Sequence, residues 1–476
     1  ALAPSTTQTL ELTFDLKDMA SYRESDGCFV LEAGAYILRL GNSSRNTVPV
    51  GLLTVEREII VSRHAHICPV MKSFDELASQ PYASEHICPL QEPLEELEAP
   101  AREAESLSAD LPCIAIDPAA FETVVYHYKT PAVCAEPRVK ALLDTLSLEE
   151  MTDIVVGAGF YGAETRFTLP GSVGNTTSKF WDRGLANVAM CDGPAGLRVQ
   201  KISVVDEKDK VKPIEMPIGV FNTLPKFIRK FMVGDPKKGK MLYQYTTAFP
   251  VANALAQTWN TELLYRVGDA VYKEMKEYGC TYWLAPAINI HRNPLCGRNF
   301  EYFSEDPRLS GAMAAAITRG IQQEEGYYVT VKHYACNNQE ENRTGVSSNL
   351  SERALREIYL RGFEIAIKKG KPWALMTSYN PVNGQQSSKN WEAINGVLRT
   401  DWGYEGVVMT DWRVLSNLEE EIHAGSDVKM PEAVTSFYEH APESCDPVAL
   451  MQEGKLDKGA VLLSVRRILK LMENLE

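Results

Sequence analysis

Polar side chains suited to catalysis or ligand binding follow four short apolar runs, each with the composition of a buried β-strand. They are Asp192, Lys332 with His333, Tyr379 with Asn380, and Asp411. In a barrel the carboxyl ends of the strands meet at one face, where the connections to the following helices build active sites. If these strands share one barrel, the side chains converge on a single mouth. Charged groups of both signs satisfy hydroxyl groups by strong hydrogen bonds, so the set favours a polyhydroxylated ligand.

Asp411 is the residue best suited to covalent chemistry. Gly406 opens the β-branched run that precedes it, and Trp412 offers a flat apolar face of the kind on which sugar rings stack. A carboxylate that faces the anomeric carbon of a sugar can attack it. Lys332 and Arg343 would keep Asp411 ionised through their positive charge, as a nucleophile requires. Taken alone, Asp411 has the alternative role of capping the next helix.

The other polar residues also have structural alternatives. Asp192 fits a turn before Gly193-Pro194, His333 a core histidine, and Tyr379 a packing residue. These alternatives do not explain why charged and aromatic side chains recur at successive strand ends. The recurrence therefore favours one shared site.

Residues 136–476 alternate helical and strand patterns, which is typical of an α/β domain with a parallel sheet. The predicted strands are 154–157, 186–191, 281–285, 327–331, 373–377, 407–410 and 427–430. The predicted helices are 138–152, with Ser147 as a capping signal inside it, 262–278, 351–369 and 458–472. Their number and order predict a (β/α)8 barrel of the TIM type.

Residues 1–62 have the pattern of part of an all-β domain. The segments 9–16 and 34–41 alternate apolar and polar residues with a period of two, which predicts half-buried strands. So few strands do not form a stable sandwich by themselves. We therefore expect a segment upstream of Ala1 to complete this domain.

Residues 63–135 have the composition of an acidic linker or wrapping segment. From Asp75 to Asp110 there are ten acidic residues and one basic residue. The segment repeats one motif, as His66-Ile67-Cys68-Pro69 and His86-Ile87-Cys88-Pro89. Two histidines and two cysteines are a possible zinc ligand set, but their spacing differs from that of the usual zinc pairs. A plain surface segment is the favoured interpretation, and no metal site is predicted.

A basic insertion interrupts the α/β region at 199–240. It holds ten basic residues, five acidic residues and four prolines. Because it follows a predicted strand end, it belongs to the active-site side of a barrel, where long connections form lids or partner contacts. A solvated loop is an equally good interpretation.

The overall composition argues against some classes of partner. The chain of 476 residues carries a formal net charge of −14 at pH 7, which disfavours nucleic acid or an anionic membrane as the main partner. No apolar run approaches the roughly 20 residues of a membrane helix. Most of the ten cysteines lie in apolar segments, which favours reduced thiols and a cytoplasmic location. No cofactor is predicted.

Several motifs of the α/β region resemble those of glycoside hydrolase family 3, in its β-glucosidase branch. The motifs are 191–194, 297–301, 304–307, 332–343, 376–380 and 406–412. The longest, which begins Lys332-His333-Tyr334-Ala335, is similar to the signature loop of that family. Each motif alone is weak, whereas together they are highly specific. The resemblance covers essentially all of 136–476, in the family's order.

The resemblance implies a TIM barrel and a retaining enzyme that releases glucose from the nonreducing end of β-glucosides or short β-gluco-oligosaccharides. Asp411 would be the nucleophile that forms the glycosyl-enzyme. The residues that would bind the sugar are Asp192, Arg298, Lys332, His333, Arg343, Tyr379 and Trp412. The loop 332–343 differs from the shorter loop of the N-acetylglucosaminidase branch, which favours glucosides as substrates.

The domain order departs from the usual order in that family. Residues 10–47 resemble the final strands of the family's fibronectin type III-like domain, yet here they precede the barrel, as in a permuted architecture. The α/β sandwich that supplies the acid/base Glu in this branch would then lie upstream of Ala1. We expect a separate or nicked amino-terminal portion as partner, with a homo-oligomer also compatible. Alone, the chain should hydrolyse glucosides poorly, because general acid catalysis contributes on the order of 10²–10⁴-fold.

Three alternatives stay open. The substrate class could be β-xylosides, within the same family. Lys332 beside His333 also fits a Schiff-base lysine of a barrel aldolase or lyase. The third alternative is a sugar-binding or scaffold subunit whose partner holds the chemistry.

Overall fold

In the computed structural model the chain forms two compact units. One consists of Ala1–His66 and Ser73–His127, and the other of Ile67–Lys72 and Tyr128–Glu476. The residues that the structure describes are 5–9, 11–42, 46–71, 73–74, 111–128, 137–157, 169–177, 180, 187–214, 225, 227, 233–430 and 447–472.

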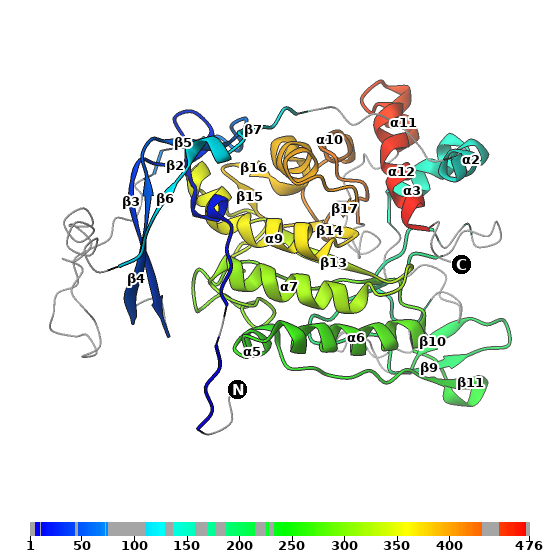
Figure 1. The fold of residues 1–476 in the computed structure, drawn as a ribbon. Helices are drawn as coiled ribbons and strands as arrows, with labels where there is room; N and C mark the ends of the chain where they lie inside the picture. Colours follow the sequence, from blue (N-terminus) through cyan, green and yellow to red (C-terminus); the bar gives the residue numbers. More distant parts are fainter. Residues whose placement is uncertain are drawn as a thin grey trace. The chain divides into compact units, whose positions relative to one another are not determined.

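The first unit contains two β-sheets (Figure 1). One has the order β1-β2-β5-β7, with the bounds Ser21–Arg23, Cys28–Leu31, Ile59–Arg63 and Val124–Val125. The other has the order β3-β4-β6, with the bounds Gly34–Gly41, Thr47–Val55 and Cys113–Ile116. Both sheets contribute to one apolar core of Leu31, Leu53, Val55, Ile59, Val61 and Ile116. The unit is therefore two sheets packed on a shared core.

The first unit confirms one predicted strand and corrects two other predictions. β3 spans the predicted residues 34–41. The described residues of the predicted strand 9–16, which are Thr9 and Glu11–Leu16, form no strand, and Asp15 caps the 3-10 helix Leu16–Met19. Residues 113–125, expected within a linker, instead supply β6 and β7, which pair in parallel with β4 and β5.

The second unit is built around a parallel sheet with the order β17-β14-β13-β12-β8. The strands are β8 (Met190–Cys191), β12 (Tyr282–Trp283), β13 (Tyr328–Tyr334), β14 (Ala374–Thr377) and β17 (Val407–Met409). Every residue of these strands is buried, as expected where both faces are covered. Single bridges extend the sheet from Met409 to Val428 and from Lys429 to Val156.

The parallel sheet with helices packed on it confirms the α/β class, and it shows fewer strands than the eight of the predicted barrel. Within the described residues five strands are regular, and the predicted strands 154–157 and 427–430 join the sheet only through bridges. Residues 138–152 form two helices, α2 (Pro137–Thr145) and α3 (Leu148–Val155), in place of one. Ser147 and Glu150 make a capping box that starts α3, and this helix runs into the segment predicted as a strand.

Helices cover the outside of the sheet. They include α5 (Ala252–Ala256), α6 (Thr261–Tyr278), α7 (Pro307–Ile321), α9 (Arg361–Gly370), α10 (Leu418–Ala424), α11 (Pro447–Gln452) and α12 (Lys458–Met472). Helix α9 continues α8 (Glu352–Ala354) and a π-helical turn at Leu355–Tyr359, and a second π-helix, η9, spans Glu392–Asp401. Figure 1 shows α6, α7 and α9 side by side. Gly320 permits the close approach of α7 to α6, because a Cβ there would lie 2.1 Å from the carbonyl oxygen of Tyr265.

Successive residues along the strands belong to two different apolar clusters. Leu375 belongs to a cluster that also contains Val271 of α6, whereas the next residue, Met376, belongs to one that contains Val465 of α12. Alternate side chains therefore face opposite sides of the sheet. This packing leaves the residues just past each strand to form the carboxyl-end face.

Described residues of the insertion 199–240 form a small antiparallel sheet with the strand that follows the insertion. It has the order β10-β9-β11, with the bounds Val211–Pro213, Ile202–Val205 and Lys240–Tyr243. Its backbone is therefore partly satisfied by regular pairing, and not only by solvent.

The first copy of the His-Ile-Cys-Pro motif is described, and the second, at 86–89, lies outside the described residues. Cys68 is buried, and its Sγ accepts a hydrogen bond from Asn390 Nδ2 at 3.1 Å. Among the described residues there is no group of three or more His, Cys, Asp or Glu side chains arranged to hold a metal. No described helix is long and apolar enough to cross a membrane.

Candidate active site

The polar residues predicted at strand ends surround one cavity of about 350 Å³. Its wall contains all eight predicted site residues, namely Asp192, Arg298, Lys332, His333, Arg343, Tyr379, Asp411 and Trp412. It also contains Val173, Arg198, Leu284, Met376 and Arg413. Asp192, Lys332, His333, Tyr379 and Asp411 lie at or just past β8, β13, β14 and β17, so the parallel sheet brings them to one face, whereas Arg298 and Arg343 come from the longer connections after β12 and β13.

Asp192 directly follows β8 and is held in a tight turn. The N–H of Arg198 donates to the Asp192 carbonyl at 2.7 Å, and Gly193 and Gly196 adopt φ of 115° and 121°, which favour glycine. Lys332 Nζ lies 3.3 Å from Asp192 Oδ1, and the Arg198 guanidinium contacts Oδ2. Burial alone would raise the pKa of Asp192, but the charges of Lys332 and Arg198 lower it to about 2. Asp192 is therefore a carboxylate that can accept hydrogen bonds from hydroxyl groups.

His333, within β13, is fixed by backbone and side-chain hydrogen bonds. The backbone N–H of His333 donates to Asn289 Oδ1 at 2.9 Å, and Asn289 Nδ2 donates to the backbone carbonyl of His333 at 2.8 Å. Arg298 Nη2 donates to His333 Nε2 at 2.9 Å. Burial, followed by the charges of Arg298 and Lys332, holds the pKa of His333 well below its usual value. The imidazole is therefore uncharged at neutral pH.

Two arginines line the cavity, and each is paired with a glutamate. Arg298 Nε lies 2.5 Å from Glu301 Oε1, and Arg343 Nη1 lies 2.9 Å from Glu340 Oε2. The Arg343 guanidinium also lies 4.1 Å from the ring centre of Tyr379, within the range of a cation–π contact. The glutamates thereby fix both guanidinium groups in position.

Asp411 lies two residues past β17 and is 7% exposed. Its Oδ1 accepts a hydrogen bond from the N–H of Trp412 at 2.8 Å, and its Oδ2 lies 3.6 Å from His333 Nε2. The carboxylate therefore lies in the wall of the cavity, next to the imidazole.

Opposing effects act on the charge of Asp411. Burial raises its pKa, while the charges of Arg298 and Lys332 and a hydrogen bond from Tyr379 lower it, and burial dominates. The sequence prediction assigned this stabilising role to Lys332 and Arg343. Lys332 acts as predicted, but Arg298 is the guanidinium with the largest effect on Asp411, in place of Arg343.

The cavity combines an attacking group with hydrogen-bonding charges of both signs. Its described wall holds two carboxylic acids, Asp192 and Asp411. With a pKa of about 2, Asp192 does not donate a proton at neutral pH. Glu301 and Glu340, behind the wall, are paired with arginines. The described part of the chain thus provides a carboxylate that can attack an electrophilic carbon, without an acid placed to protonate a leaving group.

Sequence reasoning did not identify Arg198 and Arg413 as part of the wall. Arg198 reaches Asp192 because the chain turns back between Gly193 and Gly196. The two glycines, three residues apart after a strand end, were the available signal for such a turn.

The chain is similar in sequence to a known protein family and to characterised proteins. Residues 219–471, more than half of the chain, match the glycosyl hydrolase family 3 N-terminal domain. Beta-glucosidase A of Butyrivibrio fibrisolvens is 34% identical over 484 residues, covering 95% of this chain and 50% of that protein.

Two solved structures are also similar. Beta-glucosidase 3B from Thermotoga neapolitana, in complex with α-D-glucose, is 42% identical with a TM-score of 0.59, covering 71% of this chain and 42% of that one. A beta-glucosidase from Paenibacillus barengoltzii is 27% identical with a TM-score of 0.68, covering 96% and 47%. The chain thus spans half the length of these relatives or less.

Proposed function

Because this chain belongs to glycosyl hydrolase family 3, we propose that it carries the nucleophile of a retaining β-glucosidase. Asp411 attacks the anomeric carbon of the nonreducing-end glucose and forms a covalent glycosyl-enzyme, which water then hydrolyses. The observation that supports this most is the position of Asp411 in one cavity with charged groups suited to sugar hydroxyls.

The cavity wall supplies both acceptors and donors for a sugar ring. Asp192, held ionised, accepts hydrogen bonds from hydroxyl groups, and Lys332 beside it donates them. His333 holds Arg298 next to Asp411 through its 2.9 Å hydrogen bond. Trp412 provides an aromatic surface beside the nucleophile. A sugar bound by these groups would present its anomeric carbon to Asp411.

The proton donor is proposed to come from outside this wall. Attack breaks the bond from the anomeric carbon to the leaving oxygen, and the electron pair goes to that oxygen. An alkoxide leaves slowly at neutral pH, so a second carboxyl group roughly 5–5.5 Å from the nucleophile is needed to protonate it. The described wall offers no such acid, because Asp192 is fully ionised. A further polypeptide segment, as a partner or as part of a longer chain, would supply it.

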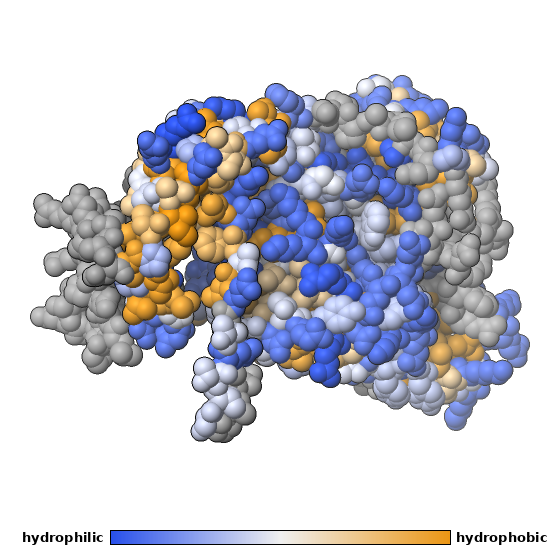
Figure 2. Space-filling view, viewed as in Figure 1, coloured by the Kyte–Doolittle hydropathy of each residue, from blue (hydrophilic) through white to orange (hydrophobic). Residues whose placement is uncertain are grey.

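We also propose that the first unit is part of a fibronectin type III-like domain that contacts this further segment. Its two packed sheets support that assignment. Leu40, Val48, Val50 and Ile114 on β3, β4 and β6 are exposed, and Figure 2 shows apolar surface over these strands. Contiguous exposed apolar side chains commonly mark a contact surface.

Leaving-group dependence tests the proposal. The chain should cleave 2,4-dinitrophenyl β-glucoside, because dinitrophenolate leaves without a proton. Cleavage of methyl β-glucoside should be on the order of 10²–10⁴-fold slower than in a full-length relative, because the described wall offers no general acid. Asp411→Asn should abolish both reactions. Cleavage that survives Asp411→Asn would overturn the proposal. Matched aryl β-xylosides decide between the two classes of substrate.

A further inference from the structure

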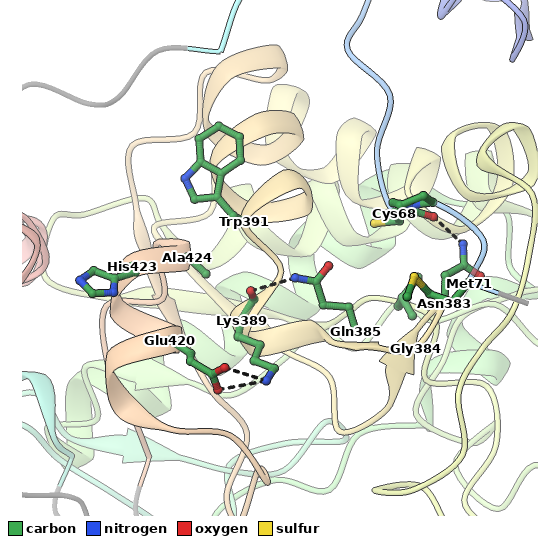
Figure 3. Close-up of a pocket in the computed structure, with 12 residues that line it drawn as sticks. Cys68, Met71, Asn383, Gly384, Gln385, Lys389, Trp391, Glu420, His423 and Ala424 are labelled. Carbon is green, nitrogen blue, oxygen red and sulfur yellow. Dashed lines mark hydrogen bonds and ion pairs between the residues drawn. The ribbon is translucent and has the colours of Figure 1, made fainter. Parts of the chain in front are cut away.

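A second cavity, of about 560 Å³, lies in the barrel unit (Figure 3). It is lined by Cys68, Pro69, Met71, Val382, Asn383, Gly384, Gln385, Lys389, Trp391, Glu420, His423 and Ala424. None of these residues lines the cavity that contains Asp411. The second cavity is the larger of the two, and its volume is within the range of small-ligand sites.

The two cavities are built on the same pair of strand-to-helix connections. After β14, Tyr379 lines the first cavity, and the hairpin of β15 (Pro381–Val382) and β16 (Gln385–Gln386) lines the second. After β17, Asp411 lines the first cavity, and Glu420 of α10 lines the second. A hydrogen bond of 2.7 Å between Ser388 Oγ and Ser416 Oγ joins the two connections. Both cavities therefore belong to the set of loops that builds sites in a barrel.

One wall of the second cavity is held by buried contacts. The hairpin turns at Asn383 and Gly384, whose φ values of 47° and 87° suit a two-residue turn. Asn383 Nδ2 donates to the carbonyl of Cys68 at 2.7 Å, and Met71 lies against Gly384. These contacts fix the segment Ile67–Met71 to the hairpin, so this wall is preorganised. A preformed site avoids the cost of ordering on binding.

The polar part of the lining is balanced in charge. Lys389 Nζ lies 3.0 Å from both carboxylate oxygens of Glu420, as Figure 3 shows. Gln385 Nε2 donates to the Lys389 carbonyl at 3.4 Å, and the exposed Gln385 side chain retains donor and acceptor capacity. Because Lys389 and Glu420 neutralise each other, neither attracts a charged ligand strongly. Neighbouring donors and acceptors instead suit vicinal hydroxyl groups.

The apolar part of the lining includes an aromatic side chain. Trp391 is 38% exposed, and its ring is supported edge-on by Tyr128 at a centroid distance of 5.4 Å. A supported, partly exposed indole gives an apolar face beside polar groups. This combination suits a sugar ring, which has hydroxyl groups at its edge and C–H groups on its faces.

We propose that this second cavity is an accessory site for a neutral oligosaccharide. A sugar ring stacks on Trp391, and its hydroxyl groups bind Lys389, Glu420 and Gln385. The site holds saccharide without cleaving it, and it keeps a longer substrate close to the catalytic cavity. The choice of β-gluco-oligosaccharide as ligand rests on the proposed function, whereas the site itself rests on its own geometry.

Calorimetric titration of the full chain with cellotetraose tests this inference. Asp411→Asn prevents turnover, and saturating 1-deoxynojirimycin, a glucose mimic, occupies the catalytic cavity. Cellotetraose should still bind under these conditions. Trp391→Ala and Lys389→Met should each weaken that binding on the order of tenfold, from lost stacking and lost hydrogen bonds. Gln385→Ala, at an exposed position, repeats the test if either variant fails to fold.

A matched control uses Asp192→Asn, which should weaken 1-deoxynojirimycin binding without changing the residual cellotetraose binding. Complete displacement of cellotetraose by 1-deoxynojirimycin, or unchanged affinity in folded Trp391 and Lys389 variants, would overturn the accessory site. Residual cellotetraose binding with no binding of 1-deoxynojirimycin would instead count against the proposed function and leave the accessory site standing. The two failures are thus distinguishable.

Discussion

Nε2 of His333 lies 3.6 Å from Oδ2 of Asp411, although His333 is on β13 and Asp411 follows β17, with β14 between the two strands. The same nitrogen accepts a hydrogen bond from Arg298, and the pKa of His333 is held well below its usual value. The imidazole is therefore not the counter-charge of the carboxylate. That role belongs to Arg298 and Lys332, with the neutral imidazole placing Arg298.

The pH dependence of activity should report this electrostatic arrangement. Burial raises the pKa of Asp411, and only the ionised form attacks, so kcat/KM should fall as pH drops through that raised pKa. Because Arg298 lowers the pKa of Asp411, Arg298→Gln should move the acid limb to higher pH. The pH profile for 2,4-dinitrophenyl β-glucoside gives the position of the limb. Arg198→Gln, which acts on Asp192, is the control and should move it less. A limb that stays in place or moves to lower pH in Arg298→Gln would contradict this account.

Loss of the Asp192 carboxylate should weaken sugar binding more than it slows chemistry. Its pKa of about 2 means that it is a charged acceptor throughout the working range, and hydrogen bonds to charged groups contribute about 1.5–3 kcal/mol. Asp192→Asn should therefore raise KM for an activated glucoside roughly 10- to 100-fold. Steady-state kinetics measure the effect. An unchanged KM with a reduced kcat would remove Asp192 from the set of sugar-binding residues.

The Schiff-base alternative makes an opposite prediction for Lys332. Its Nζ lies 3.3 Å from the Asp192 carboxylate, and formation of a Schiff base would require this ion pair to break. Treatment with borohydride and a carbonyl substrate should leave Lys332 unmodified in a peptide mass map. A reduced adduct on Lys332 would favour the aldolase or lyase interpretation.

A buried charge cluster should be important for the stability of the second unit. Asp427 lies 2.8 Å from Arg399 Nη2 and 2.7 Å from Arg467 Nη1, with almost no exposed surface. Asp427→Asn leaves both guanidinium groups without their carboxylate and should cost about 3–5 kcal/mol in the free energy of unfolding. Lys273→Ala, which breaks the exposed pair with Asp269, should cost less than about 1 kcal/mol. Urea denaturation compares them, and equal losses would contradict the prediction.

The sequence was sufficient to predict eight of the side chains that line the cavity containing Asp411, although Arg198 and Arg413 were missed. Asp192, Lys332, Tyr379 and Asp411 are each marked by the local apolar run before them, and buried parallel strands bring such positions together. Helices α6 and α12 were predicted almost to the residue, because their amphipathic patterns are long. The local sequence pattern predicts secondary structure well where a helix is long or a strand is buried on both faces.

The missed features depend on contacts between distant residues. Alternation over 9–16 predicts a strand, yet no described strand pairs with that segment. β6 and β7 are short and lie beyond an acidic stretch, so their pairing with β4 and β5 left no local signal. The Arg298–Glu301 and Arg343–Glu340 pairs are local in sequence, but their orientation toward Asp411 is set by the barrel. Of the predicted strand 154–157, Ile154 and Val155 belong to helix α3, because the capping box at Ser147 starts a helix there, and Val156 forms a bridge to Lys429.

The most direct test of the central claim is covalent trapping at Asp411. In 2,4-dinitrophenyl 2-deoxy-2-fluoro-β-glucoside the fluorine slows both steps, and the leaving group needs no proton, so the glycosyl-enzyme should accumulate on this chain alone. Intact mass should rise by one fluoroglucosyl group, and peptide sequencing should place it on Asp411, with no label in Asp411→Asn. A label on any other residue, or none after complete release of dinitrophenolate, would contradict the assignment of Asp411 as the nucleophile.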